Sequence, residues 1–305
     1  MRIRKPGKID SNLWWLGAEE SGVYLLRGRD GAALINGGLS FILPDVLTQM
    51  REFGIDPGEI TKFLILHSHF DHVGMVPYFK RKYPAIEVLA SEAALKTFEK
   101  PAAIEFINSY NQLTAGKRNE SLKGFDLEWR DDIAPLTVRE GDIIDLGRVV
   151  LKIYETPGHS NCSISAYEPD QGVLFASDAM GIPFSDKLFP SMNTNIDQFL
   201  NSLEKLKTLK VNVFCADHYG YVTGDEAQTI VSETIKEALG WKARLYETFT
   251  RNALDIDSAA REITSSFYQE MPGYFIAPEI LEGVFKQIFK YIAKTSQAPL
   301  EKRAG

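Results

Sequence analysis

The chain of 305 residues contains little cysteine and no long apolar run. Its two cysteines, Cys162 and Cys215, are too few for a disulfide framework. We expect each to be a small buried side chain or, as the alternative, a redox-sensitive thiol. No stretch approaches the roughly 18 apolar residues that a membrane helix needs, so we expect no membrane span. The basic segment 1–7 is not followed by the apolar core of a secretory signal, and a cytoplasmic protein is therefore expected.

Positive charge is also scarce. The chain has 34 lysines and arginines against 41 aspartates and glutamates, which gives a net charge of −7. An acidic chain does not favour the positive surface that binds nucleic acid, so we expect no nucleic-acid partner. The G-x-S-x-G motif of many serine hydrolases does not occur, and a serine nucleophile is not supported. With 44% hydrophobic residues, a chain of this length can bury a large core.

Histidine is rare, yet all five histidines stand in patterns typical of metal ligands. Imidazole is the commonest metal ligand in proteins, and a carboxylate adds charge and can bridge two ions. Residues 67–72 spell H-x-H-x-D-H, and three further candidates follow at wide intervals. Five histidines and two aspartates can serve two metal ions at once. The candidate ligands are His67, His69, Asp71, His72, His159, Asp178 and His218.

Each group of candidates is expected at the end of a strand. The apolar run 62–66 predicts a buried strand that ends at His67. Similar stretches at 149–155, 172–176 and 211–215 precede the later candidates. Open sheets carry their ligands beyond the carboxyl ends of the strands. We therefore expect four strand ends to present the candidate ligands at one common edge.

The ordered set of motifs resembles the metallo-β-lactamase superfamily. In that family, H-x-H-x-D-H, a later histidine, an aspartate and a last histidine bind two metals on an αββα sandwich of the α/β class. The zinc β-lactamases carry cysteine at the position that is Asp178 here. The site is therefore similar to the glyoxalase II branch of thioesterases, lactonases and related hydrolases, and the resemblance implies that antibiotic hydrolysis is not the activity.

For this ligand set we expect two divalent metal ions per chain, zinc or iron, with manganese also possible. One ion would be bound by His67, His69 and His159, and the other by Asp71, His72 and His218, with Asp178 as the bridge. A water between two such ions loses a proton near neutral pH, and the resulting hydroxide would attack an activated carbonyl. The ions would then stabilise the oxyanion and the leaving thiolate or alkoxide. Asp71 and Asp178 are the catalytic candidates.

Short segments across nearly the whole chain resemble a narrower family, the quinolone-signal response proteins, which are bacterial thioesterases of this fold. They include the segments 6–10, 37–40, 89–92, 178–181 and 275–279. That family hydrolyses an aroylacetyl-coenzyme A thioester and also acts by contact with a transcriptional regulator. The resemblance implies a small-molecule acyl thioester or ester as substrate, with a homodimer and a regulatory protein partner as further options.

Three functional classes stay open. The first is a thioesterase or related ester hydrolase, and it includes a lactonase. The second is an iron-dependent dioxygenase that uses the same fold with one iron, and oxygen uptake would distinguish it. The third is a regulatory protein that retains the metal site but acts by protein contact, and a metal-ligand variant would distinguish it.

The patterns divide the chain into two parts. We expect a metallo-β-lactamase-fold catalytic domain over 1–224 and a helical C-terminal extension over 225–305. The extension would cap the site, form a dimer surface, or do both. Its aromatic residues include Tyr274 and Phe275, which we expect to line the substrate pocket.

Helix patterns are expected in both parts. In the first part, residues 96–117 predict one long helical stretch that lies over the site. In the extension, residues 225–251 predict a long helix, and Ser258 is the expected N-cap of the next helix. Pro278 then predicts the start of the last helix.

Overall fold

Two seven-stranded sheets form the centre of the computed structural model, which describes the backbone of residues 1–301. The strands of the first sheet, in spatial order, are β1 (Arg2–Ile3), β16 (Tyr221–Thr223), β15 (Val213–Cys215), β12 (Val173–Phe175), β11 (Ile164–Glu168), β10 (Val150–Glu155) and β9 (Ile143–Asp145). Those of the second are β2 (Gly7–Asp10), β3 (Leu13–Ala18), β4 (Ser21–Arg27), β5 (Ala32–Ile35), β6 (Ile60–Leu64), β7 (Glu87–Ser91) and β8 (Leu136–Val138). A short ribbon pairs β13 (Gly181–Ile182) with β14 (Phe189–Pro190).

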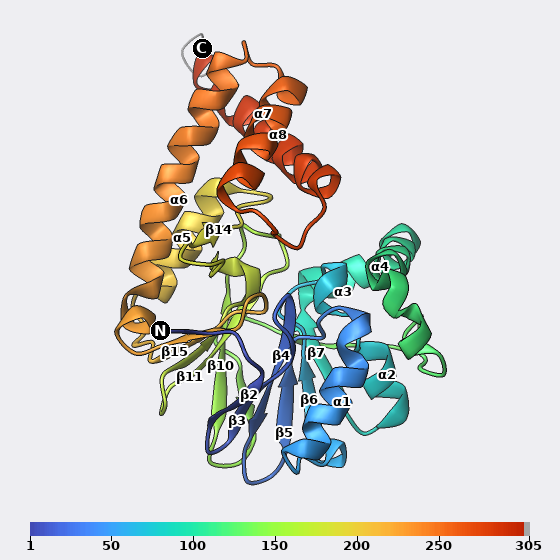
Figure 1. Cartoon of the computed structure of the whole chain (residues 1–305). Coiled ribbons are helices and arrows are strands. Elements are labelled where there is room, and N and C mark those ends of the chain that lie inside the picture. Colours follow the sequence, from blue (N-terminus) through green and yellow to red (C-terminus); the bar gives the residue numbers. More distant parts are fainter. Residues whose placement is uncertain (302–305) are drawn as a thin grey trace.

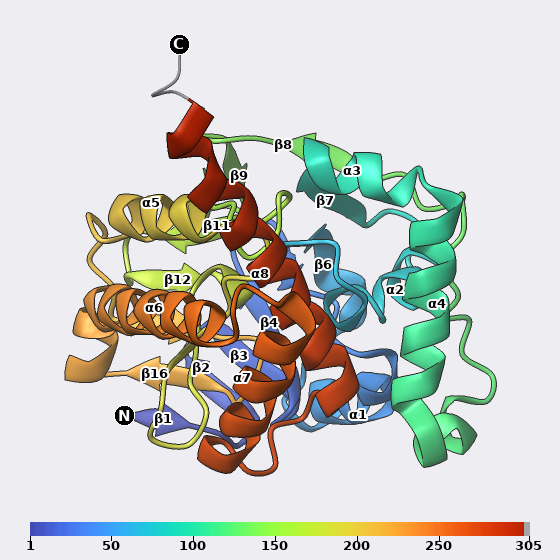
Figure 2. The ribbon, with the colours of Figure 1, turned by 90° about the horizontal axis from the view of Figure 1, so that it is seen from above.

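Helices cover the outer face of each sheet (Figure 1). The second sheet is covered by α1 (Leu43–Glu52), α2 (Val76–Lys82), α3 (Glu92–Phe98) and α4 (Pro101–Ala115). The first sheet is covered by α5 (Ile196–Leu206) and α6 (Asp225–Arg251). The predicted αββα sandwich is therefore confirmed. The last helices, α7 (Ile256–Glu270) and α8 (Pro278–Glu301), lie across the upper edge of the sandwich, as Figure 2 shows from above.

Burial on both faces explains why the central strands are apolar throughout. In β4, Tyr24 and Leu26 point into the cluster between the two sheets, whereas Val23 and Leu25 pack against the helices. Successive side chains of a strand point to opposite faces, so a strand that is covered on both sides needs no polar positions. The hydrophobic core consequently has three layers, one between the sheets and one beneath each set of helices.

The C-terminal helices continue the core beneath α5 and α6. Trp241 of α6, Phe267 of α7 and Phe285 of α8 belong to the same hydrophobic cluster as Leu174 and Phe214 of the first sheet. The expected helical extension is therefore confirmed as a helical region that packs on the sandwich. The division at residue 224 into two domains stays a prediction, and residues 302–305 of the expected extension lie outside the described residues.

Two of the helix predictions are wrong in detail. Residues 96–117 form two helices instead of one, because Lys100 adopts an extended backbone before Pro101, as a residue preceding proline prefers. Helix α7 begins before Ser258, and its N-cap is Asp255, whose side chain accepts a hydrogen bond from the Ser258 amide at 2.8 Å. The predicted helix 225–251 and the predicted start of α8 are confirmed.

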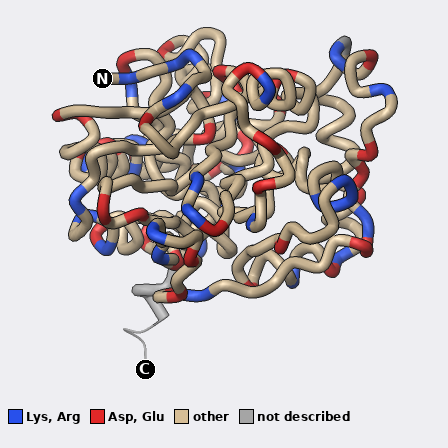
Figure 3. Tube along the Cα trace, turned by 90° about the horizontal axis from the view of Figure 1, so that it is seen from below, with Lys and Arg blue, Asp and Glu red and all other residues tan. Residues whose placement is uncertain are grey.

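Charged residues of both signs are interspersed along the chain when the molecule is seen from below (Figure 3). Within residues 1–301, no helix is both long enough and apolar enough to cross a membrane. The expected absence of a nucleic-acid partner stays a prediction.

Candidate metal centre

Four loops at the upper edge of the sandwich bring all seven candidate ligands together. His67 and the following short helix Phe70–His72 come after β6, and His159 comes after β10. Asp178 lies in the short helix Ser177–Ala179 after β12, and His218 follows β15. Six of the seven side chains are buried, and His69 is partly exposed. The prediction that four strand ends present these residues at one edge is confirmed.

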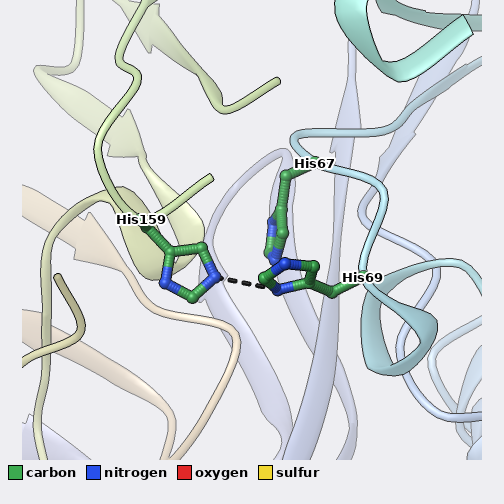
Figure 4. Close-up of side chains that lie close together, drawn as sticks. All are labelled: His67, His69 and His159. Carbon is green, nitrogen blue, oxygen red and sulfur yellow. Dashed lines mark hydrogen bonds between the residues drawn. The ribbon is translucent and has the colours of Figure 1, made fainter. Parts of the chain in front are cut away.

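The first group of nitrogen atoms belongs to His67, His69 and His159. One ligand atom from each residue lies within 4.8 Å of the other two. Figure 4 shows His67 and His69 on one loop and His159 on the loop that faces it. The His159 Nε2 and His69 Nδ1 atoms are 3.0 Å apart. Two lone pairs at this distance repel each other unless a proton or a metal ion lies between them.

The second group is formed by Asp71, His72 and His218. The Nε2 atoms of His72 and His218 face each other at 3.3 Å, and Asp71 Oδ2 lies 3.5 Å from the former and 3.6 Å from the latter. Asp178 stands between the two groups. Its Oδ2 atom is 3.4 Å from His72 Nε2 and 3.5 Å from His159 Nε2. One carboxylate therefore contacts both groups.

The nitrogen atoms of the first group are suited to a metal ion. The buried His67 Nε2 atom has no hydrogen-bond partner, although buried polar atoms are normally paired. Burial lowers the pKa of His67, His69 and His159, in the case of His69 to about 3, so these rings are neutral. Metal ions bind the neutral form of imidazole, whose lone pair is free. The residues present therefore fit a divalent metal.

The carboxylates of the centre stay ionised although they are buried. Burial by itself raises the pKa of Asp71, but the charge and hydrogen bond of His72 outweigh it and lower the pKa to about 2. The pKa of Asp178 is lowered in the same way, chiefly by His72 and His218. Among the described residues, the only basic groups within 4 Å of these two carboxylates are histidine rings. Buried anions of this kind require cations, which a metal centre supplies.

Groups outside the ligand set hold the rings in place, and the sequence analysis missed them. In four of the five rings, all except that of His69, Nδ1 faces a protein acceptor and Nε2 faces the cluster. The acceptors are Asp217 Oδ2 for His72 at 3.0 Å, the Ser191 carbonyl for His159 at 2.8 Å, the Glu20 carbonyl for His218 at 2.7 Å and Ser177 Oγ for His67 at 3.3 Å. Such contacts fix the tautomer and the orientation of metal-binding histidines.

Asp217 and Ser177 form the most buried part of this support. The Ser177 hydroxyl donates to Asp217 Oδ2 and accepts from the side-chain amide of Asn36 at 3.2 Å. Ser177 and Asn36 adopt left-handed backbone conformations with φ of 49° and 64°, which are strained for residues other than glycine. Asp217 precedes His218 and Ser177 precedes Asp178, and this adjacency is the signal that could have identified both residues.

A cavity of about 250 Å³ adjoins the metal centre and is bordered by Tyr274 and Phe275. The Phe275 ring stacks on His218 with 4.4 Å between the ring centroids. The two aromatic residues thus lie where a pocket wall would be, and their role in substrate binding stays a prediction. A second cavity of about 810 Å³ shares Phe70, Phe275, Ile276 and Ile280 with the first.

Comparison with known proteins identifies similar sequences. The sequence model described as "Metallo-beta-lactamase superfamily" matches residues 16–218. A metallo-beta-lactamase fold-containing protein of Sulfurisphaera tokodaii is 24% identical over 219 residues, which are 71% of this chain and 78% of that protein. A hydroxyacylglutathione hydrolase of Nitrobacter winogradskyi is 28% identical over 162 residues, 52% of this chain and 49% of that enzyme. An acyl-coenzyme A thioesterase of Gallus gallus is 27% identical over 189 residues, 56% of this chain and 64% of that enzyme.

The alignments with these two enzymes thus span about half to two thirds of each enzyme. Among solved structures, a metallo-beta-lactamase family protein from Thermus thermophilus superposes with a TM-score of 0.67 at 20% identity. It covers 94% of this chain and 95% of its own length, so the likeness in fold takes in most of the C-terminal helices.

Proposed function

The chain belongs to the metallo-beta-lactamase superfamily, and we propose that it is a metal-dependent hydrolase of a thioester or related ester. The convergence of His67, His69, Asp71, His72, His159, Asp178 and His218 beside an apolar cavity carries this proposal. A carboxylate that contacts both groups and a ligand set of nitrogen and oxygen atoms would suit metal ions that promote hydrolysis. Sequence similarity to a hydroxyacylglutathione hydrolase and to an acyl-coenzyme A thioesterase supports the thioester as the substrate class.

Two divalent cations would be held by the two groups of side chains described above. The first group is His67, His69 and His159, the second is Asp71, His72 and His218, and Asp178 contacts both. When bound, such ions supply Lewis acidity and lower the pKa of coordinated water, which makes hydrolysis possible near neutral pH. Zinc and iron are the expected metals, with manganese as the alternative.

The side chains around the centre position the substrate and limit access of water. Phe275 stacks on His218, and the buried Tyr274 lines the same cavity as the candidate ligands and residues of α8. Apolar walls beside a charged centre exclude bulk water and strengthen the electrostatic interactions within. An apolar acyl group would lie against these rings, while its carbonyl carbon lies at the metal ligands.

The test combines metal analysis with a substrate panel. Protein that is purified from zinc- and iron-replete medium should carry close to two metals per chain. It should hydrolyse acyl thioesters in a panel that also contains simple esters and lactones. An electrode that follows oxygen distinguishes the dioxygenase, because hydrolysis consumes no oxygen. A metal content near zero, with no activity regained when metal is added, would refute the proposal that the protein is an enzyme. The alternative of a regulatory protein that acts by protein contact would then remain.

The matched variants for this test are Asp178→Asn in the centre and Asp197→Asn on α5, an exposed carboxylate that pairs with Lys242. Only the first should lose activity. The expected homodimer, regulatory partner and cytoplasmic location stay predictions.

A further inference from the structure

One hydroxyl beside the candidate ligands is not used within the protein. The cavity of about 250 Å³ is bordered by five of the seven candidate ligands and by the hydroxyls of Ser191, Thr194 and Tyr274. Ser191 donates to the side-chain carbonyl of Asn193 at 3.1 Å. Thr194 donates to the Gly158 carbonyl at 2.8 Å. Among the described residues, the Tyr274 hydroxyl has no hydrogen-bond partner, so it is the hydroxyl that can bind a substrate.

The Tyr274 side chain is buried, yet its hydroxyl is open to the cavity. The residue as a whole is 7% exposed. Among the described residues, His67 Nε2 is one of the atoms that are both closed off from solvent and unpaired, but the Tyr274 hydroxyl is not. Burial raises the pKa of Tyr274, and the charge of Asp178 is the next cause. The hydroxyl therefore lies on the side of the ring that faces the metal centre.

The segment that carries Tyr274 is held in place by two other phenol groups. The Phe275 amide donates to the Tyr219 hydroxyl at 3.0 Å. The Tyr268 hydroxyl donates to the Ile276 carbonyl. Both of these hydroxyls thus serve the backbone directly after Tyr274, which fixes the position of the loop between α7 and α8.

The ring of Tyr274 is fixed by aromatic neighbours. It packs edge-to-face with Phe184, Phe189 and Phe267, with 5.5, 6.0 and 5.0 Å between the ring centroids. Such packing leaves the ring little freedom to turn away from the cavity. A donor that is oriented before the substrate binds needs no reorganisation during the reaction.

Hydrolysis of a thioester places negative charge on the carbonyl oxygen for part of the reaction. When the oxygen of water adds to the carbonyl carbon, the π electron pair of the C=O bond moves to the carbonyl oxygen. When that pair returns, the C–S bond breaks and sulfur leaves with the bonding pair, so that a carboxylic acid and a thiol result. A phenol, with an ordinary pKa near 10, can donate a hydrogen bond to this oxygen and keep its proton. Donors directed at this oxygen usually contribute more to catalysis than any other single effect.

We propose that the Tyr274 hydroxyl donates a hydrogen bond to the carbonyl oxygen of the substrate and stabilises the oxyanion that forms there. The inference rests on the proposed hydrolysis of a thioester or ester. It assigns a catalytic residue to the C-terminal helical region, which lies after the last candidate ligand, His218. The active site would then be complete only when the loop between α7 and α8 is in place.

The first experiment uses Tyr274→Phe, which removes the hydroxyl and keeps the ring. With metal-loaded protein, kcat on an acyl thioester should fall at least about tenfold, whereas KM should change less than about threefold. A residue that acts only as an apolar wall would leave kcat unchanged. The matched control is Tyr246→Phe on α6, where the residue borders neither cavity, and it should keep the wild-type kcat. Metal content and thermal unfolding are measured for both variants.

The second experiment identifies the atom that accepts the hydrogen bond. A thioester and the oxygen ester of the same acyl group are compared, and Tyr274→Phe should lower kcat by a similar factor on both. A hydrogen bond to the leaving atom would instead affect the oxygen ester more, because sulfur is a weak acceptor.

The third experiment measures binding without turnover. The probe is a trifluoromethyl ketone with the same acyl chain, whose carbonyl takes up water to form a tetrahedral centre similar to the oxyanion. Its Kd should rise at least about tenfold in Tyr274→Phe. The Kd of a thioether of the same length, which has no carbonyl oxygen, should stay unchanged.

The outcomes separate the two proposals. If metal-loaded wild-type protein cleaves neither the thioester nor the ester, the proposed function fails and the inference fails with it. If the wild type is active and Tyr274→Phe keeps its kcat, the proposed function stands and the role of Tyr274 is refuted. A loss confined to the oxygen ester, or equal weakening of the ketone and the thioether, also refutes it.

The cavity contains a competing donor, the side-chain amide of Asn193. Asn193→Asp removes this donor but keeps an acceptor for the Ser191 hydroxyl. A loss of kcat in Asn193→Asp, with none in Tyr274→Phe, would assign the role to Asn193 and overturn the inference. Should Tyr274→Phe fail to fold, Tyr274→Leu takes its place in all three experiments with the same expectation for the ketone.

Discussion

Replacement of Asp217 by asparagine should weaken metal binding at the second group of ligands more than at the first. Asp217 Oδ2 accepts from His72 Nδ1 at 3.0 Å and from the Ser177 hydroxyl, whereas its other oxygen has no partner. The variant keeps the shape of the side chain but removes its charge. A hydrogen bond to a charged group contributes about 1.5–3 kcal/mol, which corresponds to about 10- to 150-fold in affinity.

A second argument gives a similar magnitude. Loss of a group that orients a metal-binding histidine typically costs about 10- to 100-fold in metal affinity. His72 contacts Asp217 directly, but His67 is linked to it only through Ser177 Oγ, at 3.3 Å. We therefore expect about 10- to 100-fold weaker binding of the second ion and a smaller effect on the first.

The assay is a competition between the protein and a chromophoric chelator, followed by elemental analysis after dialysis. Metal content should fall from near two towards one per chain for Asp217→Asn. Thermal unfolding of the metal-free proteins shows whether the variant is folded. The matched control is Asp197→Asn, in which an exposed carboxylate on α5 that pairs with Lys242 and contacts no candidate ligand is changed. Unchanged affinity for both ions, or a loss confined to the first ion, would refute the reasoning.

Three further predictions follow from the site and its supports. Asp178→Ala should abolish thioester hydrolysis and leave the circular dichroism spectrum unchanged, because Asp178 contacts both ligand groups and belongs to no hydrophobic cluster; normal turnover would contradict the proposed centre. Phe275→Ala should lower the ratio of aromatic to aliphatic thioester turnover about twofold to tenfold in steady-state kinetics. The reason is that a contact between aromatic rings contributes about 0.5–1.5 kcal/mol in addition to the burial of apolar surface. An unchanged ratio would show that Phe275 does not form a wall of the substrate pocket. Gly158→Ala should destabilise the fold by at least about 2 kcal/mol in denaturant unfolding, because φ is +137° and the new Cβ would lie 2.3 Å from the Phe199 backbone. Gly240→Ala is the matched control, because a Cβ at this position in α6 would meet no neighbouring atom, and it should stabilise the fold by about 0.5–1 kcal/mol. Equal effects of the two substitutions would show that the contact between Gly158 and Phe199 does not determine the stability change.

Local patterns in the sequence were enough to predict that the candidate ligands cluster and which strands carry them. The motif at residues 67–72 follows an apolar run, and each later candidate also follows a short strand pattern. These inferences succeed because a strand, its end and a dense motif are properties of neighbouring residues.

Helix ends were harder to predict because they depend on single contacts. Pro101 interrupts the pattern that predicts one helix over 96–117, and Asp255 caps α7 ahead of the expected residue. Both signals are present in the sequence, but several neighbouring residues can serve as caps. The backbone conformation of the residues that precede the helix decides which residue serves as the cap.

Only the tertiary structure decided what surrounds the ligands. The carbonyls of Ser191 and Glu20 accept from His159 and His218, yet a backbone carbonyl has no signature in the sequence. The ion pair between Glu20 and Arg118 likewise joins a turn of the second sheet to the short helix Gly116–Leu122, 98 residues away along the chain. Such pairings depend on long-range packing of the whole fold, which no local periodicity encodes, and they set the orientation of the candidate ligands.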